Sequence, residues 1–527
     1  MNKFLKILNV FFVALILLLV GFVLGKKYDF TYDENNEIIL LKTSKNEHKI
    51  RKLIALINDQ YIGNVNSDSL VDDALNTMIN KLDPHSTYLS KEMSKKSDEE
   101  LNGEFSGLGV QFRIFEDTIT VSRVFNDSPN QKILQFGDKI IGIKEQSLLG
   151  KNAEKFNSIV AKLTDTSIPI KILRNDKELS LNLTKKMIPI PTVEGKHMIT
   201  KDLGYIRLIR FSDKSAAEVH AALQDLLNQG MKTLVFDLRG NPGGVMRAAE
   251  EIADEFLREK ELIVYTKDKK GERKDIFATN YGLFEHGKVY VLIDESSASS
   301  SEIVARALQD YGRGTIVGRR SFGKGLVQRE VALGDDSRVR LTVANYYTPA
   351  GRSIQRPYDK GKLAYADDIY ERLKNGELYS KDSIKVNEKL KFKAPSGKIV
   401  YGGGGIIPDE FVPFDVSSIS NWLIYNNDSP YYEQFLYKKA LEISDLFMLK
   451  NEKTYIKYFG AGILRDDFLK MMGIPLNQFD NKFSTTIDKY IKATIAKEIF
   501  GPRAYYEIWN DEDEMIKKIL ELEKTKS

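Results

Sequence analysis

The stretch that most constrains the fold of this chain runs from residue 294 to residue 328. An apolar, β-branched run, Lys288–Ile293, comes immediately before it and predicts a buried strand. Within it, apolar residues recur at helical spacing from Ile303 to Tyr311 and predict a helix. Five serines lie between the two: Ser296, Ser297, Ser299, Ser300 and Ser301. We therefore expect them at a strand-to-helix turn, where the free N–H groups and the dipole of the helix favour an anion.

A serine run at the start of a helix has two interpretations. Most such serines simply cap the helix. A hydroxyl beside an anion site also suits a nucleophile, because its attack on a carbonyl creates an oxyanion. The residues that follow favour the second interpretation. A further strand, expected at residues 315–317, leads to Lys324, which lies between two glycines that let the backbone pass close to other groups.

The lysine segment GRRSFGKG, residues 318–325, nearly matches the nucleotide-binding pattern G-x-x-x-x-G-K-S/T. Two features argue against that function. Gly325 stands where a magnesium-binding hydroxyl is needed, and residues 326–333 have the pattern of a strand instead of the helix that a phosphate-binding loop opens. The sequence therefore disfavours a nucleotide site.

Three motifs resemble those of one peptidase family: SASSSE at residues 297–302, FGKG at 322–325 followed by Gln328, and DLRGNPGG at 237–244. The chain is similar in them to the C-terminal processing peptidases, also called tail-specific proteases. The resemblance implies a Ser-Lys dyad endopeptidase with a crotonase-like core and a PDZ domain. It assigns Ser299 as the nucleophile and Lys324 as the base, a choice that chemistry alone could not make among the neighbouring serines.

The same resemblance implies an oxyanion hole made by the backbone N–H groups of Gly244 and Ser300. Residues 240–244 are expected where a strand meets the start of a helix, so their N–H groups are free to face an anion, although a tight turn is the simpler interpretation. Gln328 lies four residues after Lys324. On a strand this even spacing places both side chains on one face, so we expect Gln328 to hydrogen-bond and orient the amine.

Composition excludes several other classes of function. The chain has 527 residues, 42% hydrophobic and 29% charged, which is ordinary for a globular protein of several domains. A net charge of +4 is too small to indicate nucleic-acid binding. There is no cysteine, the five histidines are scattered, and no ligand spacing for a metal is present. We therefore expect no cofactor and no metal site.

The N-terminus predicts a membrane anchor over residues 1–27. Residues 7–24 are apolar except for Asn9, and 18 helical residues span about 27 Å, enough for a bilayer core. A cleaved signal peptide is the alternative, but no A-x-A-like site follows the apolar run. The positive charge of the free N-terminus favours an orientation in which the start of the chain lies on the cytoplasmic side of the membrane. We therefore expect a bacterial inner-membrane protein whose catalytic domain lies in the periplasm.

The segment before the core divides into two expected regions. Residues 28–95 form a small helical region, with apolar residues at helical spacing over 48–62 and 70–82. It ends in the phrase LDPHSTYL, residues 82–89, where Pro84 stops the helix and His85 is interpreted as a turn residue. Residues 96–188 carry alternating strands and look like a PDZ domain. Its loop for the C-terminal carboxylate of a substrate would comprise Gly107, Leu108, Gly109 and Val110.

From residue 189 to 416 strands and helices alternate, as in an α/β core, and residues 417–527 have helical patterning. The predicted fold class is thus an α/β multidomain protein: a crotonase-like protease core with an inserted PDZ domain, an N-terminal helical segment and a helical C-terminal domain.

The predicted function is serine endopeptidase activity near the C-terminal tails of proteins. The expected partners are protein or peptide substrates with a free C-terminus and the membrane, with possible homo-oligomerisation and no nucleic acid. An inactive PDZ-bearing binding or scaffold protein is the alternative from another class, and the presence of Ser299, Lys324 and Gln328 together disfavours it. A crotonase-like acyl-CoA hydratase or thioesterase is a further alternative among enzymes. Only the fold class supports it, and a fold does not determine chemistry.

Overall fold

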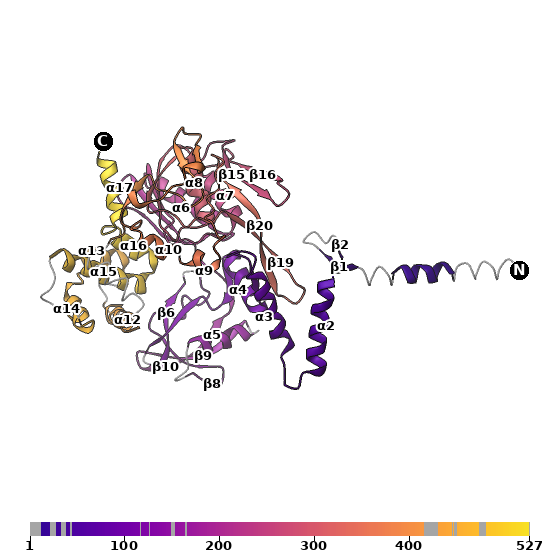
Figure 1. The fold of residues 1–527 in the computed structure, drawn as a ribbon. Coiled ribbons are helices and arrows are strands. Elements are labelled where there is room, and N and C mark those ends of the chain that lie inside the picture. Colours follow the sequence, from indigo (N-terminus) through magenta and orange to yellow (C-terminus); the bar gives the residue numbers. More distant parts are fainter. Residues whose placement is uncertain are drawn as a thin grey trace. The chain divides into compact units, whose positions relative to one another are not determined.

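The computed structural model describes residues 12–21, 28–32, 38–42, 45–115, 117–125, 127–148, 153–163, 166–415, 430–444, 446, 451–473 and 481–525. The chain forms two compact units, Met1–Leu82 and Asp83–Ser527. Figure 1 shows the chain as a ribbon coloured along the sequence, with some of its helices and strands labelled.

The first unit is small and largely helical. Residues 12–21 are helical. Strands β1 (Tyr28–Tyr32) and β2 (Ile38–Lys42) pair antiparallel, and helices α2 (Lys45–Gln60) and α3 (Ser67–Ile79) follow. The two expected helices are confirmed, whereas the strand pair was not predicted. Part of the predicted anchor lies outside the described residues, and within the described ones no helix combines the length and the apolar character needed to cross a membrane.

A six-stranded sheet forms the core of the second unit. Its order is β12 (Val193–Met198), β13 (Leu203–Leu208), β14 (Thr233–Asp237), β17 (Lys288–Ile293), β18 (Gly314–Gly318) and β23 (Glu410–Phe411). All neighbours are parallel except β12 and β13. Because the carboxyl ends of parallel strands meet at one edge, the loops after β14 and β17 lie close together there.

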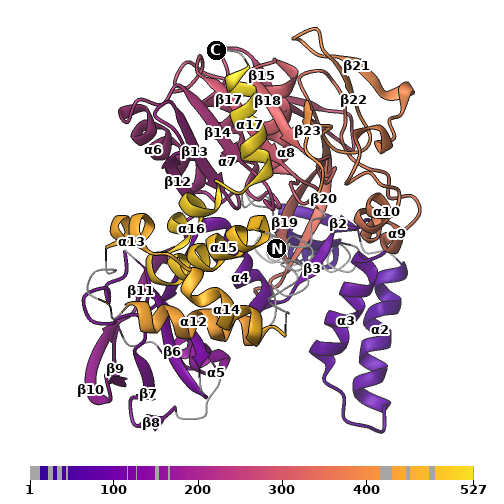
Figure 2. The ribbon, with the colours of Figure 1, turned by 90° about the vertical axis from the view of Figure 1, so that its left-hand side faces the viewer.

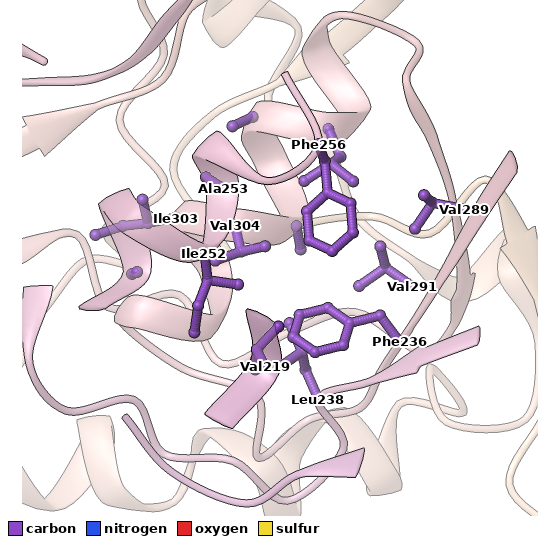
Figure 3. Packing of buried hydrophobic residues seen from close by; sticks show 14 of the residues in the cluster. Val219, Phe236, Leu238, Ile252, Ala253, Phe256, Val289, Val291, Ile303 and Val304 are labelled. Carbon is purple, nitrogen blue, oxygen red and sulfur yellow. The ribbon is translucent and has the colours of Figure 1, made fainter. Parts of the chain in front are cut away.

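Alternate residues of these strands face two different helical layers. One layer comprises α6 (Ser215–Asn228), α7 (Met246–Asp254) and α8 (Ser300–Asp310). Phe236 and Val291 pack against it, and Phe236 lies 5.8 Å from Phe256 between ring centroids (Figure 3). On the opposite face, Val235 and Tyr290 pack with residues of the last helix, α17 (Glu514–Lys524), which crosses the strands in Figure 2.

A second sheet lies beside this core and carries the lysine segment. Its order is β16 (Arg273–Phe277), β15 (Leu262–Asp268), β20 (Arg338–Tyr347) and β19 (Leu326–Ala332), with β3 (Thr87–Leu89) paired to β20. The strand expected after the glycine-flanked lysine is therefore confirmed as β19. The pairing of β3 with β20 brings the turn that precedes β3 next to the start of β19.

The charged insertion that follows β20 forms small elements. These are α9 (Lys362–Ala366), α10 (Asp368–Lys374), β21 (Lys391–Lys393) and β22 (Ile399–Tyr401).

After α4 (Lys91–Asn102), residues 104–189 form a β-rich region with a hydrophobic core of its own. Its elements are β4 (Glu104–Gly107), β5 (Val110–Phe115), β6 (Thr118–Val124), β7 (Lys139–Ile143), β8 (Gln146–Ser147), α5 (Ala153–Lys162), β9 (Ser167–Arg174), β10 (Lys177–Thr184) and β11 (Lys186–Pro189). The sheet order is β10-β9-β7-β6-β5, so β5 is an edge strand.

The C-terminal segment is helical, as predicted. Helices α12 (Pro430–Ser444), α13 (Glu452–Tyr458), α14 (Gly462–Met471), α15 (Asn481–Phe500) and α16 (Pro502–Trp509) share one hydrophobic cluster. Tyr437 of α12 donates its hydroxyl to Val121 O at 3.0 Å, which ties this cluster to β6. Helix α17 instead covers the core sheet, so the molecule is a mixed α/β protein whose last helix completes the core.

Candidate active site

Ser299 occupies the turn between β17 and α8. Its backbone has φ 54° and ψ −114°, a region that non-glycine residues rarely adopt and that costs about 1–3 kcal/mol. Helix α8 begins at the next residue. The side chain is partly exposed, whereas Ser300 and Ser301, the first two residues of the helix, are buried. The turn thus presents one hydroxyl beside the N-terminus of a buried helix.

Hydrogen bonds distinguish Ser299 from the other serines of the cluster. The three buried hydroxyls all donate to carbonyls of the loop after β14: Ser297 to Leu238 at 2.8 Å, Ser300 to Gly244 at 3.0 Å and Ser301 to Asn241 at 3.0 Å. Ser296 is exposed. Within the described residues the Ser299 hydroxyl donates no hydrogen bond, although its oxygen caps α8 by accepting the backbone N–H of Glu302. Three serines therefore hold the turn against the loop, and Ser299 keeps a free hydroxyl proton.

The loop after β14 passes directly beside this hydroxyl. A Cβ atom at Gly243 would lie 2.7 Å from Ser299 Cβ and 2.9 Å from Ser300 N, and one at Gly244 would lie 2.0 Å from Phe211 O. Both positions have positive φ, 97° and 143°, and so require glycine. In the described part of the chain neither Gly244 N nor Ser300 N donates a hydrogen bond. Two unused backbone donors therefore lie close to the Ser299 hydroxyl.

Lys324 lies in the loop just before β19 and is held through its amine. Its Nζ donates to Gln328 Oε1 at 2.7 Å, and Gln328 Nε2 donates to His85 O at 2.5 Å. The carbonyl of His85 thereby fixes the orientation of the Gln328 amide, because only the amide NH₂ can donate to it. The expected contact between Lys324 and Gln328 is present, although Lys324 is not on the strand and the register shifts between Val327 and Gln328.

The surroundings of Lys324 favour its neutral form. Burial, together with the nearby charge of Arg340, lowers the pKa of Lys324 to about 8 against the opposing effect of Glu302 and Asp83. Burial also lowers the pKa of His85 to about 4, so the imidazole is neutral at pH 7. An amine that titrates near neutral pH can act as a general base.

Glu302 connects the serine and the lysine, and sequence reasoning did not assign it a role. Its Oε2 accepts the backbone N–H groups of Ser299 and Lys324, each at 2.9 Å, so these nitrogens lie no more than twice that distance apart. Its Oε1 accepts Ser321 Oγ at 2.5 Å and Gly323 N at 2.8 Å. Burial raises the pKa of this carboxyl. The sequence signal was present, since a Glu three residues after a Ser is the capping-box pattern.

His85 is the second contributor that the sequence interpretation set aside. It lies in a turn, as expected, and Asp83 Oδ1 accepts the N–H groups of His85 and Ser86 at 2.8 Å. Its ring Nε2 contacts Tyr365 Oη at 2.8 Å. The functional atom is the backbone carbonyl that binds Gln328, which no side-chain pattern could indicate.

The structure thus brings Ser299, Ser300, Gly244, Lys324 and Gln328 into one place. No hydrogen bond between Ser299 Oγ and Lys324 Nζ is present among the described residues. In an enzyme without substrate such bonds are often long and tighten only in the complex. The arrangement offers a free hydroxyl, two free N–H donors and an amine with a lowered pKa.

Comparison with known proteins identifies the family. A family model described as peptidase family S41 matches residues 202–360, and one described as the activating protease CtpB N-terminal domain matches residues 27–93. The carboxy-terminal-processing protease of Bartonella bacilliformis is 36% identical over 328 residues, 59% of this chain and 75% of that protein. The chain belongs to the carboxy-terminal-processing proteases. It is a serine-type peptidase.

A second relative agrees with this assignment. Carboxy-terminal processing protease CtpB of Bacillus subtilis is 33% identical over 358 residues, which cover 65% of this protease and 73% of the relative. Among solved structures, a photosystem II D1 C-terminal processing protease is 26% identical, with a TM-score of 0.33, and the match covers 59% of this chain and 84% of the other.

The second predicted site of the protease is the 107–110 loop, between β4 and β5. Gly109 has a positive φ of 67°, and a Cβ there would lie 2.6 Å from Ser128 Oγ. Leu108 O accepts Ser128 Oγ at 2.9 Å and Asn130 Nδ2 at 2.7 Å. Within the described residues, the N–H groups of Leu108 and Gly109 donate no hydrogen bond. None of the hydrogen bonds of this loop reaches the Ser299 site.

Proposed function

We propose that this chain is a serine endopeptidase that cleaves proteins near their C-terminal tails, with Ser299 as nucleophile and Lys324 as general base. One observation carries the proposal: Glu302 Oε2 binds the backbone N–H groups of Ser299 and Lys324 at 2.9 Å, and so holds the two reacting residues together. The free hydroxyl of Ser299 and the lowered pKa of Lys324 support it.

The reaction begins when Ser299 Oγ attacks the scissile carbonyl and Lys324 Nζ takes the hydroxyl proton. The N–H groups of Gly244 and Ser300 bind the resulting oxyanion, and their position beside a helix N-terminus adds to its stabilisation. The ammonium of Lys324 then gives its proton to the leaving amine. A water molecule, deprotonated in turn by Lys324, attacks the acyl carbonyl, and as the bond to Ser299 Oγ breaks Lys324 returns this proton to Oγ, which restores the enzyme.

Gln328 gives the amine its direction. A neutral amine has two N–H donors and one lone pair. Because Lys324 donates to Gln328 Oε1, whose amide is fixed by His85 O, one donor is already used and the lone pair is left for the serine proton. Gln328 is therefore a positioning residue in this scheme.

The test is a set of variants of the full-length chain. We expect Ser299→Ala, Lys324→Ala and Lys324→Arg each to lower kcat/KM by about a thousand-fold or more, with an unchanged melting temperature. Arginine fails because a guanidinium stays protonated. The measurement is hydrolysis of a fluorogenic peptide that ends in a free carboxylate.

Matched controls are Ser296→Ala, which removes an exposed hydroxyl from the same cluster, and Lys360→Ala, which removes an exposed lysine. Both should keep wild-type activity. Appreciable activity of Lys324→Arg would make Lys324 a structural cation. A folded wild-type chain without any activity would favour the scaffold alternative.

We further propose that the core is crotonase-like and that residues 104–189 form a PDZ domain which binds the substrate tail. The two free N–H groups of the 107–110 loop suit a terminal carboxylate. Among the described strands β5 pairs with β6 alone, so its other edge is open to a peptide that adds as a further strand.

We also propose that the N-terminal segment anchors the protein in the membrane and that the protein forms homo-oligomers. The apolar residues 7–24 support an inner-membrane anchor with the protease unit in the periplasm. Helices α2 and α3 have no buried residue, and apolar side chains such as Leu53 and Met78 are exposed on them, which supports homo-oligomerisation through this unit.

A further inference from the structure

A buried arginine lies directly behind the active site. Arg306 of α8 is 1% exposed, and none of its three guanidinium nitrogens has a hydrogen-bond partner among the described residues. It is balanced by charge at a distance, because Glu302 and Asp310 lie one helical turn before and after it on the same face of α8. A guanidinium without hydrogen bonds is costly to bury, so its position calls for another interaction.

That interaction is with Tyr346 of β20. The guanidinium carbon of Arg306 lies 4.4 Å from the centre of the Tyr346 ring, over its face. Tyr346 is itself 1% exposed. A cation over an aromatic face is attracted to it, most strongly where water is excluded. The pair fixes the plane of the ring, and burial raises the pKa of Tyr346, so its hydroxyl keeps its proton and can donate it.

The hydroxyl of Tyr346 contacts both members of the proposed dyad. It donates to Ser299 O at 3.1 Å and to Lys324 O. Glu302 Oε2 accepts the N–H groups of the same two residues. Ser299 and Lys324 are therefore each held twice, by the N–H on Glu302 and by the C=O on Tyr346.

We propose that Tyr346, fixed in place by Arg306, is a positioning residue that keeps the backbones of Ser299 and Lys324 in register for proton transfer. This rests on the proposed function, since it presupposes that the two residues react together. The single hydroxyl proton of Tyr346 is shared between the carbonyls of Ser299 and Lys324, so both hydrogen bonds persist only while the two carbonyls stay close together. Loss of the hydroxyl frees the lysine loop to move away from Ser299.

The test is Tyr346→Phe, which removes the hydroxyl and keeps the ring under Arg306. We expect kcat to fall by about 10-fold to 100-fold, because small misplacements of reacting groups have effects of this size, while KM changes by less than about two-fold. Tyr347→Phe is the matched control. Its side chain stacks on Tyr265, with centroids 5.0 Å apart, and it makes no hydrogen bond to the dyad.

The pH profile distinguishes positioning from a merely structural role. The charged and titratable groups around Lys324 are Arg340 on β20, Glu302 on α8, and Asp83 and His85 in the turn before β3. None of them changes in Tyr346→Phe. A lysine released from its buried position gains water, so the apparent pKa of kcat/KM should rise toward 10.5, whereas simple unfolding lowers the amplitude without moving the profile.

Wild-type kcat in Tyr346→Phe, or a loss that follows the unfolded fraction with an unmoved profile, would overturn the proposal. If Tyr346→Phe does not fold, Arg306→Met gives the same test: a lower kcat and an upward shift support the proposal, and unchanged values contradict it. Lys324→Ala is measured in the same series. If the Lys324→Ala variant were active, the proposed Ser-Lys dyad would be wrong. If Lys324→Ala were inactive while Tyr346→Phe had wild-type kcat, only the positioning role of Tyr346 would be wrong.

Discussion

Lys324 shows at the scale of one residue how the fold changes chemistry. A solvated lysine titrates near ~10.4 and is protonated at neutral pH. Burial lowers the pKa of Lys324 to about 8, and Arg340 acts in the same direction. Phe322 and Leu326, apolar neighbours of Lys324 in the sequence, fit this burial. Arg340 has no such local signal, because it reaches the site by strand pairing between β19 and β20.

The pH dependence of kcat/KM follows from this shift. With Lys324 as the proposed base, the neutral amine would be the active form, so we expect kcat/KM to rise with pH through an apparent pKa of about 8 and to fall about tenfold per unit well below it. Arg340→Gln removes a positive charge near the amine and should move the profile to higher pH. The measurement is a kcat/KM profile from pH 6 to 10 with a neutral peptide. A flat profile between about pH 6 and 9 would exclude Lys324 as the base.

At the scale of single elements, the 107–110 loop and strand β5 form the proposed second site, which would bind the substrate tail. The loop offers unused N–H groups, and the edge of β5 offers backbone partners over Val110–Phe115. A terminal carboxylate and an extended backbone match these two features. The sequence predicted the loop from its two glycines and the strand from the alternating pattern that follows them.

Amidation of the substrate tail tests this pairing. Peptides that end in apolar residues and a free carboxylate should have a lower KM than their amidated versions, because amidation removes the charge that the proposed loop site would bind. The kcat should change less, since the Ser299 site is unaffected. Steady-state kinetics on the matched peptide pair checks this, with a soluble ester substrate as control. Equal KM values for both peptides would rule out selection of the tail by its carboxylate.

At the scale of the whole molecule, local patterns predicted most elements, and long-range packing decided the rest. The strand, turn and helix around Ser299 follow from periodicity, because each needs only its own residues. The destination of α17 does not. Its apolar stripe is typical of any amphipathic helix. It packs on the core sheet because Val235 and Tyr290 lie on a face that would be exposed without it.

The parts of the site that sequence reasoning missed have the same origin. Ser299, Lys324 and Gln328 came from motifs within one stretch. Glu302 was visible as a cap, but its bond to Lys324 N depends on the fold of the loop between them. The carbonyl of His85 lies 243 residues from Gln328 in sequence, and only the pairing of β3 with β20 brings it there.

The central claim is that Ser299 is the nucleophile, and covalent labelling tests it most directly. A fluorophosphonate reacts with an activated serine, and mass spectrometry of the digested full-length protein locates the adduct. We predict a single adduct on Ser299 that forms faster as the pH rises through about 8 and is absent in Lys324→Ala. An adduct on another serine, or no adduct on protein shown to be folded, would contradict the assignment.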